Sequence, residues 1–276
     1  MKPRPFDYAR PDTIDEAVSL LTQAGADARV MAAGQSLMAM LNLRLLEPQV
    51  VVDITRIAAL KTIVAKGGWV TIGAAVTQSQ LLEWPDLGRY LPFIAKALPW
   101  VGHFQTRNRG TICGSLCHAD PSSEMPLSLA LLGGEICLRS ARGERWVKAP
   151  EFQVGLLSVA RADDEVAVAV RFPMAEGQPA AFQEVARRHG DFAIVAAGVV
   201  SDAKGALHVG IAGMVDRPYV APIPDGLAGS AMADWANETA WRLGGLDDIH
   251  ATPRYRRDLL RRILPHLIEE VQPCTA

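Results

Sequence analysis

The sequence predicts an α+β fold in two parts, and two patterns indicate it. Short strand and helix patterns alternate up to Pro173, whereas three long strand patterns follow one another between residues 180 and 214. A chain of 276 residues is long enough for more than one domain. We therefore expect a first domain over residues 1–175, with subdomains of about 1–55 and 56–175, and a second domain over 176–276, with residues 174–180 as the boundary.

The first subdomain is predicted as strand, turn, helix and strand. Residues 28–34 form an apolar strand pattern that enters a glycine turn, residues 36–46 predict a short buried helix, and residues 49–54 predict the second strand. A hairpin follows over residues 60–73, because the adjacent Gly67 and Gly68 supply the positive φ angles of a tight turn. The next helix should begin at Thr77, since Thr77 and Gln80 match a capping box.

The middle of the chain continues this alternation. A helical segment is expected near residues 92–98, and residues 111–120, TICGSLCHAD, read as a small-residue loop leading into a helix. Asp120 and Pro121 match an N-cap and a first-turn proline, and Gly133 can end the apolar helix that follows. Residues 134–147 then predict a hairpin, and residues 164–173 predict a strand that ends at a proline.

The last hundred residues predict an antiparallel meander followed by helices. Strands are expected over residues 180–188, 192–202 and 206–214, with short turns between them. Two helices should follow, near residues 230–243 and 253–271, and Pro265 is expected to kink or split the second. The predicted C-terminal domain is thus a three-stranded antiparallel sheet with helices.

Composition and charge exclude several classes of partner. The 28 basic and 30 acidic residues give a net charge of −2, so no overall field favours nucleic acid or an anionic membrane. No apolar run is long enough to span a bilayer and the N-terminus lacks a signal-peptide pattern, so we expect a cytoplasmic protein. In that compartment the four cysteines should be reduced thiols: Cys113, Cys117, Cys137 and Cys274.

Two segments of small residues share a design that suits an anion. Ala32 to Ser36 and Thr111 to Ser115 each follow an apolar stretch and end with a hydroxyl. Small side chains let a bound group approach the main chain, and consecutive N–H groups can form a nest around phosphate. The alternative interpretation is a pair of ordinary tight turns between packed elements. A mononucleotide phosphate loop is excluded, because the chain contains neither GKS nor GKT.

The cysteines and histidine of residues 111–120 raise a metal or haem alternative. Thiolate and imidazole are soft-metal ligands, and Cys113, Cys117 and His118 lie close together in the chain. A zinc site needs a fourth ligand, however, and haem attachment uses CxxCH where this chain has CxxxCH. We expect buried thiols without metal. We also expect no catalytic residue, since GxSxG, HExxH and a paired-carboxylate pattern are absent from the sequence.

Four stretches in this order carry a family resemblance: MAAGQSLMAMLNLRL, VTIGAAVT, RNRGTICGSLCHADPSSEMP and RRHGDFAIV. They resemble the medium, FAD-binding subunit of molybdenum-containing hydroxylases, the family of carbon monoxide, nicotine and xanthine dehydrogenases. The similarity spans nearly the whole chain. It implies a two-part FAD-binding domain of the PCMH (vanillyl-alcohol oxidase-like) type. The chain departs from the family pattern at four positions, where Ala33 and Cys113 replace glycine, Ala39 replaces proline and Ser115 replaces asparagine.

The resemblance also implies which residues bind FAD. The two small-residue segments would hold the pyrophosphate, Glu124 would lie near a ribose, and Phe192 would lie close to the isoalloxazine ring, although a core phenylalanine is the alternative for Phe192. The cofactor-binding residues implied are Ala32, Ala33, Gly34, Gln35, Ser36, Thr111, Cys113, Gly114, Ser115, Asp120, Glu124 and Phe192. The lysine that many relatives have near residues 183 and 184 is missing here.

By the same resemblance the chain is an electron-transfer subunit. It would take electrons from a small 2Fe-2S subunit, beside a large molybdopterin subunit that hydroxylates the substrate, and pass them to an external acceptor. The complex would be a dimer of heterotrimers. Two alternatives stay open at this point: a stand-alone FAD-dependent oxidase or reductase of the same superfamily, and a metal-binding module that uses the cysteines and histidine.

Overall fold

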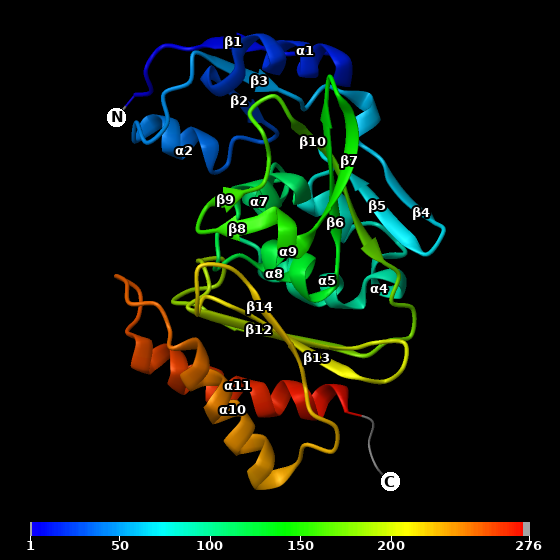
Figure 1. Cartoon of the computed structure of the whole chain (residues 1–276), viewed down its shortest axis with the longest axis vertical. Coiled ribbons are helices and arrows are strands. Elements are labelled where there is room, and N and C mark those ends of the chain that lie inside the picture. Colours follow the sequence, from blue (N-terminus) through cyan, green and yellow to red (C-terminus); the bar gives the residue numbers. More distant parts are fainter. Residues whose placement is uncertain (1, 273–276) are drawn as a thin grey trace.

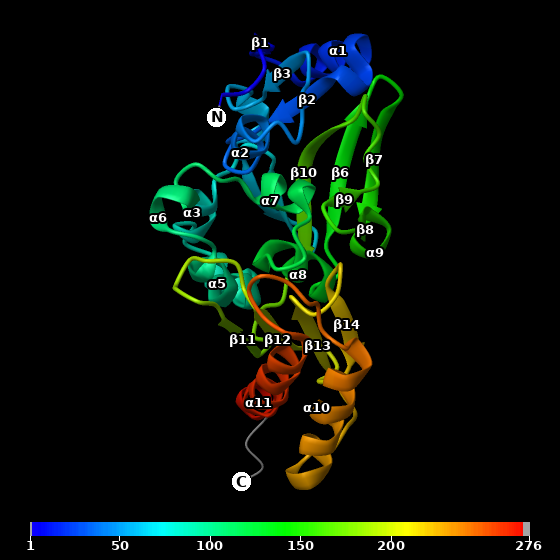
Figure 2. The same cartoon turned by 90° about the vertical axis from the view of Figure 1, so that its left-hand side faces the viewer.

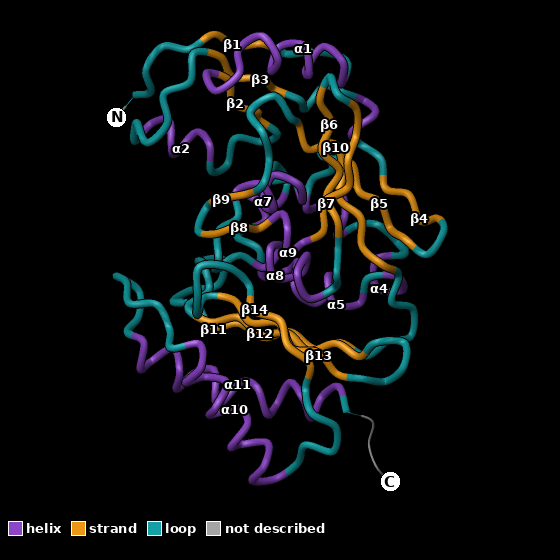
Figure 3. Tube along the Cα trace, viewed as in Figure 1, coloured by secondary structure: helices purple, strands orange, loops and turns teal. Residues whose placement is uncertain are grey.

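The computed structural model describes residues 2–272 and arranges three sheets one after another along its long axis (Figure 1). A three-stranded sheet lies at the N-terminal end, a five-stranded sheet in the middle and a four-stranded sheet beyond it. Two C-terminal helices cover the far side of the four-stranded sheet (Figure 3). No helix in residues 2–272 combines the length and the apolar character needed to cross a membrane.

The N-terminal sheet is parallel, with the order β1-β3-β2, so each connection between its strands crosses over through a helix. Thr13 starts the first of these helices with a capping box to Glu16. The predicted strand, turn, helix and strand are confirmed, but the helix ends at Asn42 and leaves Leu43 and Leu45 exposed beyond it. The elements are β1 (Asp7–Ala9), α1 (Ile14–Ala24), β2 (Ala28–Met31), α2 (Leu37–Asn42) and β3 (Val50–Asp53).

The middle sheet is antiparallel, with the order β4-β5-β10-β6-β7. Both predicted hairpins are confirmed, and Gly67 and Gly68 take φ angles of 61° and 81° in the first of them. These positive angles match the right-handed twist of the flanking strands. The strands are β4 (Ile63–Lys66), β5 (Trp69–Gly73), β6 (Glu135–Ser140), β7 (Gly143–Lys148) and β10 (Val166–Pro173).

Short helices lie between this sheet and the next one. The predicted capping box at Thr77 is confirmed: the Thr77 hydroxyl accepts from the Gln80 N–H, and the Gln80 side chain accepts from the Thr77 N–H. The helices are α3 (Gln78–Leu82), α4 (Leu87–Tyr90), α5 (Pro92–Ala97), α6 (Phe104–Arg107), α7 (Ile112–His118), α8 (Glu124–Leu131) and α9 (Ala149–Phe152), with short 3-10 turns at Ala58–Leu60 and Leu98–Trp100. A small hairpin, β8 (Gln153–Gly155) and β9 (Ser158–Val159), follows α9.

Residues 111–120 differ from their prediction. They do not form a loop, because residues 112–118 are the helix α7 and Thr111 is its N-cap. Asp120 is also not the N-cap of the next helix, since α8 begins three residues after Pro121 and Ser123 occupies the N-cap position. The Asp120 carboxylate instead accepts from the Ser122 N–H at 2.8 Å, which forms a local turn between the two helices.

The C-terminal part contains the predicted meander and one further strand. Strands β11 (Ala180–Val185), β12 (Val195–Ser201) and β13 (Leu207–Ala212) pair in sequence order, and β14 (Tyr219–Pro222) adds a fourth strand to the three expected. Helices α10 (Gly229–Leu243) and α11 (Pro253–Val271) confirm the two predicted helices. Pro265 does not split α11, which is assigned as one helix through that residue.

One face of the C-terminal sheet packs against α11, and the other faces α5 and α8. On this second face Gly198 and Gly210 sit opposite each other on β12 and β13. A Cβ atom on Gly198 would lie 2.2 Å from the Phe93 ring of α5, and one on Gly210 would lie 2.8 Å from Leu127 of α8. The two glycines therefore form the hollow into which both helices pack.

We expect Gly198→Ala to destabilise the chain by about 1–3 kcal/mol, because the new methyl group overlaps a rigid ring in a close-packed core. The free energy of unfolding in urea measures this. Gly88→Ala is the matched control, since a Cβ there has nothing within 4 Å and alanine favours a helix. Equal stability of Gly198→Ala and the wild-type chain would contradict this account of the packing.

Candidate cofactor site

A cleft of about 810 Å³ lies where the N-terminal unit, the middle helices and the β11–β12 loop meet. Figure 2 shows α2 of the N-terminal unit above α7 and α8 of the middle layer. The cleft is within the range of about 300–1,000 Å³ that ligand pockets occupy. Its lining is assembled from segments far apart in the sequence, from residues 29–40 to residues 190–192.

The first small-residue segment turns between β2 and α2. Gly34 has a φ of 72°, and a Cβ added there would lie 3.1 Å from both Met31 and Met38. The Gly34 carbonyl accepts from the Met38 N–H at 3.0 Å, which starts α2 directly after the turn. Glycine is needed at this position because a side chain would meet both a strained backbone angle and two neighbouring methionines.

The second small-residue segment is the first turn of α7. The Thr111 hydroxyl accepts from the Gly114 N–H at 3.0 Å, and a single bridge joins Thr111 to Thr77. Because the N–H groups of Ile112, Gly114 and Ser115 all have partners within the protein, the nest of free N–H groups predicted here is not formed. Cys113 is also not in the left-handed region, so it carries no backbone strain.

The two segments nevertheless lie next to each other. A Cβ on Gly114 would lie 3.9 Å from the Ala32 Cβ, and 2.8 Å from the Thr111 hydroxyl. A ligand can approach the main chain closely here, because Ala32 and Gly114 have almost no side chain. This part of the cleft is therefore shaped for a group that lies against the backbone.

The loop between β11 and β12 forms another wall. Phe192 on this loop is 58% exposed and lines the cleft, so its interpretation as a core phenylalanine is wrong. The buried Arg256 of α11 fixes the end of the loop, because its guanidinium donates to the carbonyls of Ile194 and Gly213. At the other end Gly190 packs on His103, where an added Cβ would lie 2.7 Å from the imidazole ring.

Eleven of the twelve residues implied by the resemblance line the cleft, and Asp120 is the exception. Sequence reasoning missed several other residues of the lining. Gln78 and Gly110 lie beside Thr111, and Gly190 and Asp191 belong to the quoted RRHGDFAIV stretch without having been assigned a role. Arg29 and Arg161 also line the cleft, but single arginines in the sequence gave no signal.

Burial controls the ionisation of the groups in the cleft. Desolvation raises the pKa of the Cys117 thiol to about 11 and that of Cys113 well above its usual range, so both stay protonated at neutral pH. Desolvation likewise lowers the pKa of His118, which favours the neutral imidazole. It raises the pKa of Glu124 to about 7. The thiols and the imidazole of the cleft are thus uncharged at neutral pH.

The metal alternative gains no support from the side chains of residues 2–272, where no three His, Cys, Asp or Glu residues gather as a ligand set. Cys113, Cys117 and Cys137 are free thiols, and the fourth cysteine, Cys274, lies outside the described residues.

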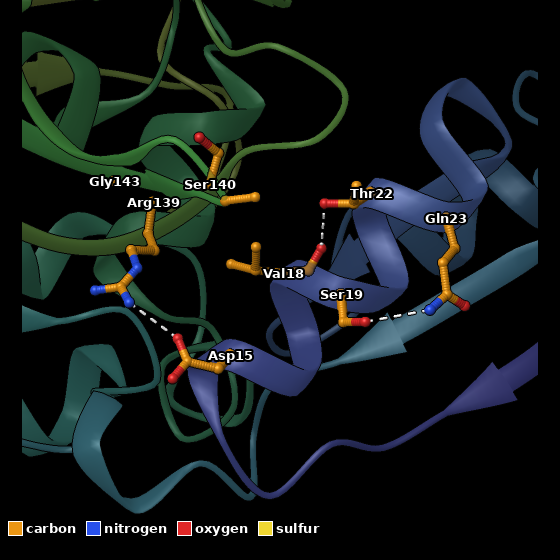
Figure 4. Close-up of a pocket in the computed structure, with 9 residues that line it drawn as sticks. Asp15, Val18, Ser19, Thr22, Gln23, Arg139, Ser140 and Gly143 are labelled. Atoms are coloured by element: carbon orange, nitrogen blue, oxygen red, sulfur yellow. Dashed lines mark hydrogen bonds and ion pairs between the residues drawn. The ribbon is translucent and has the colours of Figure 1, made fainter.

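A second depression, between α1 and the β6–β7 hairpin, has a different character (Figure 4). It has a volume of about 450 Å³ and is an open groove rather than an enclosed pocket. Its charged groups satisfy each other, because Arg139 bridges Asp15 and Glu144 at 2.9 Å each. Neither of the two charged side chains that line the groove, Asp15 and Arg139, is therefore left unpaired.

The large cleft fits FAD on three observations. The segments around Gly34 and Gly114 let a pyrophosphate reach the main chain, and the aromatic Phe192 is exposed on the cleft wall for a planar ring. Gln78 is buried and lines the cleft, yet its Oε1 atom has no hydrogen-bond partner within the described chain. An unpaired buried acceptor is costly, and a hydroxyl or N–H group of a ligand would satisfy it.

Comparison with known proteins agrees with this geometry. Residues 4–175 match the family model for the FAD binding domain in molybdopterin dehydrogenase. The chain is 39% identical over 195 residues to 6-hydroxypseudooxynicotine dehydrogenase complex subunit alpha of Paenarthrobacter nicotinovorans, which covers 70% of this chain and 66% of that one. It is 31% identical to the nicotine 6-hydroxylase medium subunit of the same organism, over 98% of both chains. A chain of quinoline 2-oxidoreductase from Pseudomonas putida 86 superimposes with a TM-score of 0.92 and 31% identity over 99% of both chains.

We expect the Cys117 thiol to react slowly with iodoacetamide at pH 8. A rise of its pKa from 9.0 to about 11 lowers the thiolate fraction at pH 8 by about a hundredfold. Peptide mass spectrometry after timed alkylation measures the rate, and the same chain unfolded in urea is the control. A native rate equal to the unfolded rate would show that the thiol is not held in an apolar environment.

Proposed function

Since the chain belongs to the family of FAD binding domains in molybdopterin dehydrogenases, we propose that it is the FAD-carrying electron-transfer subunit of a molybdenum hydroxylase. The single observation that carries this proposal is the cleft itself, which brings the two small-residue segments and Phe192 together as the resemblance implies. Bound FAD would supply the chemistry, because a flavin exchanges electrons both singly and in pairs.

The residues of the chain would bind and orient the cofactor and would not take part in the reaction themselves. Ala32 to Ser36 and Thr111 to Ser115 would hold the pyrophosphate against the backbone, and Glu124 would accept a hydrogen bond from a ribose hydroxyl group. Phe192 would pack beside the isoalloxazine ring. The surrounding thiols stay protonated and leave the flavin as the redox group of the site. This division of roles accounts for the lack of a catalytic motif in the sequence.

We further propose that the chain works inside a larger complex. The relatives are named as subunits of dehydrogenase or hydroxylase complexes, which supports a small 2Fe-2S subunit and a large molybdopterin subunit as partners. A dimer of heterotrimers in the cytoplasm is the corresponding assembly. A stand-alone oxidase or reductase is the second candidate, and it would need a substrate site that uses the same cleft.

Packing supports the domain division predicted from the sequence. One apolar core draws on buried residues within 17–172 and another on buried residues within 181–271. The family model also ends at residue 175. We propose that residues 1–175 are the FAD-binding domain, with its two subdomains, and that residues 176–276 are a C-terminal domain docked on it.

Co-purification tests the assignment of function. The chain, tagged and expressed from its native host, is expected to carry FAD and to bring with it one iron–sulfur chain and one molybdopterin chain. The absorption spectrum and metal analysis of the purified material measure both. A yellow chain that purifies alone and is reduced directly by a small organic substrate would favour the stand-alone enzyme, and a colourless chain that takes up no FAD would refute the proposal.

We expect Gly34→Val to lose most of its FAD while the chain stays folded. The new side chain would press on Met31 and Met38, each 3.1 Å from the added Cβ, and would add strain at a φ of 72°, so the turn that is to hold the pyrophosphate would have to shift. Flavin content per chain and the circular dichroism spectrum are the measurements. Gly205→Val is the matched control, because Gly205 has a φ of 85° with nothing within 4 Å of its Cβ position and does not line the cleft. Equal FAD loss in both variants would attribute the effect to backbone strain alone.

A further inference from the structure

Two glutamates are buried next to each other at the inner end of the cleft. Glu124 is 6% exposed and is the first residue of α8, where it lines the cleft. Glu184 is 5% exposed, lies on β11 and is not part of the lining. Carboxyl groups are seldom buried without partners, so the pair needs a physical explanation.

The sheet geometry explains why the two side chains meet. Glu184 pairs with Ala196, and it shares one face of β11 with Phe182, which pairs with Gly198. This is the face that receives α5 and α8, whereas Ala181 and Val185 on the opposite face pack with α11. Because α8 begins at Glu124, its first side chain lies close enough to Glu184 for each carboxyl group to shift the pKa of the other.

Within residues 2–272 no cation forms an ion pair with either carboxyl group. Both carboxyl oxygens of Glu184 are buried without a partner among the described residues. Arg107 acts on Glu124 from α6, but its guanidinium donates to three backbone carbonyls, and Asp120 adds a further negative charge. Strand β12, beside Glu184, has no titratable side chain. The remaining titratable groups on the surrounding elements are Lys96, which pairs with Glu270 at the surface, His208 of β13, which faces Asp202 at 3.7 Å, Tyr219 of β14, and His103, Cys113, Cys117 and His118.

A single proton shared by the pair removes the repulsion between two buried carboxylates. If Glu184 is protonated, its O–H donates to Glu124, and one buried charge remains instead of two. Glu124 is the better carboxylate, because it occupies the first turn of α8, where the helix dipole favours negative charge, and because it reaches the cleft. Burial raises the pKa of Glu184 to about 8, and the neighbouring Glu124 charge adds to this effect.

We propose that Glu184 is a positioning residue that holds a proton, donates it in a hydrogen bond to Glu124, and thereby fixes the Glu124 carboxylate as the acceptor for a hydroxyl group of the cofactor. The affinity of the cleft for FAD then depends on one proton that no part of the cofactor touches. This inference rests on the proposed function for the identity of the ligand, but the proton itself belongs to the protein.

The direction of the pH dependence follows from the two pKa values. As pH rises through about 8 the proton leaves Glu184, the two carboxylates repel each other, and Glu124 loses its orientation. Because Glu124 ionises near pH 7 and Glu184 loses its proton near pH 8, FAD binding should be tightest between these values and should weaken as pH rises above about 8. In the cofactor-free chain the folded-state pKa lies above the ordinary value of 4.5, so the stabilisation is complete below about 4.5 and is lost as pH rises to about 8.

Flavin fluorescence titrations of the full chain between about pH 6 and pH 9 test the proposal. The dissociation constant of the wild-type chain should rise by up to about tenfold per pH unit above about pH 8, the limit for one proton. Glu184→Gln keeps an N–H donor but has no proton to lose, so its affinity at pH 7 should stay within about threefold of wild type, and the weakening above about pH 8 should be absent. Glu238→Gln, at an exposed position on α10, is the matched control and should follow the wild-type profile.

Thermal unfolding of the cofactor-free chain is the second measurement. The wild-type melting temperature should fall between pH 5 and pH 8 relative to Glu184→Gln. If Glu184→Gln does not fold, Glu124→Gln should reduce this pH dependence without abolishing it, because it removes the neighbouring charge but leaves Glu184 buried. A wild-type chain that binds no FAD at any pH would refute the proposed function. A chain that binds FAD with the same pH profile as Glu184→Gln, and melts with the same pH profile, would refute only the role of Glu184.

Discussion

The packing of α5 and α8 against the glycines of the C-terminal sheet is the contact on which the site depends. Gly198 and Gly210 are cross-strand partners, and their missing side chains admit Phe93 from one helix and Leu127 from the other. Because seven of the eight residues of α8 are buried, the helix has no freedom to shift along the sheet without opening a cavity or a clash. Its first residue, Glu124, is therefore held at the cleft, and the β11–β12 loop is held above it.

Arg256 of α11, on the far side of the sheet, fixes the same region through hydrogen bonds. Its guanidinium donates to the carbonyls of Ile194 and Gly213 and also pairs with Asp248. The Gly213 N–H in turn donates to the Pro121 carbonyl at 2.9 Å, in the turn between α7 and α8. One buried side chain of α11 thus connects the loop that bears Phe192 to the segment that precedes Glu124. The C-terminal domain does more than cover the cleft, because it sets the distance between two of its walls.

Much of the fold can be predicted from short stretches of adjacent residues. The elements that cannot be predicted in this way depend on contacts between distant parts of the chain. The Gly67–Gly68 hairpin and the Thr77 capping box depend on a few adjacent residues, so the sequence predicts them directly.

Helix α7 is not predicted from the sequence because cysteine, glycine and serine are weak helix formers. It forms through the Thr111 cap and the burial of Ile112 and Leu116. Strand β14 is short and ends at a proline, so its pairing with β13 gave no periodic pattern. The small-residue segments can be predicted from the sequence because their composition is unusual. The proximity of Glu124 and Glu184 cannot, because it depends on how α8 packs on the sheet that contains β11.

In the proposed function the cleft would bind an anionic cofactor with few free charges, because its arginines are already engaged within the protein. Arg29 donates to the carbonyls of Ala26 and Ala28, and Arg161 donates to those of Ala162 and Glu165, so both guanidinium groups also serve the fold. Shape must then supply much of the selectivity, through close backbone approach at Gly34 and Gly114. In such an environment a second buried carboxylate would oppose binding strongly, since little nearby charge could offset it. Keeping Glu184 protonated is the means by which the site can use Glu124 as a hydrogen-bond acceptor without also placing two negative charges beside the cofactor.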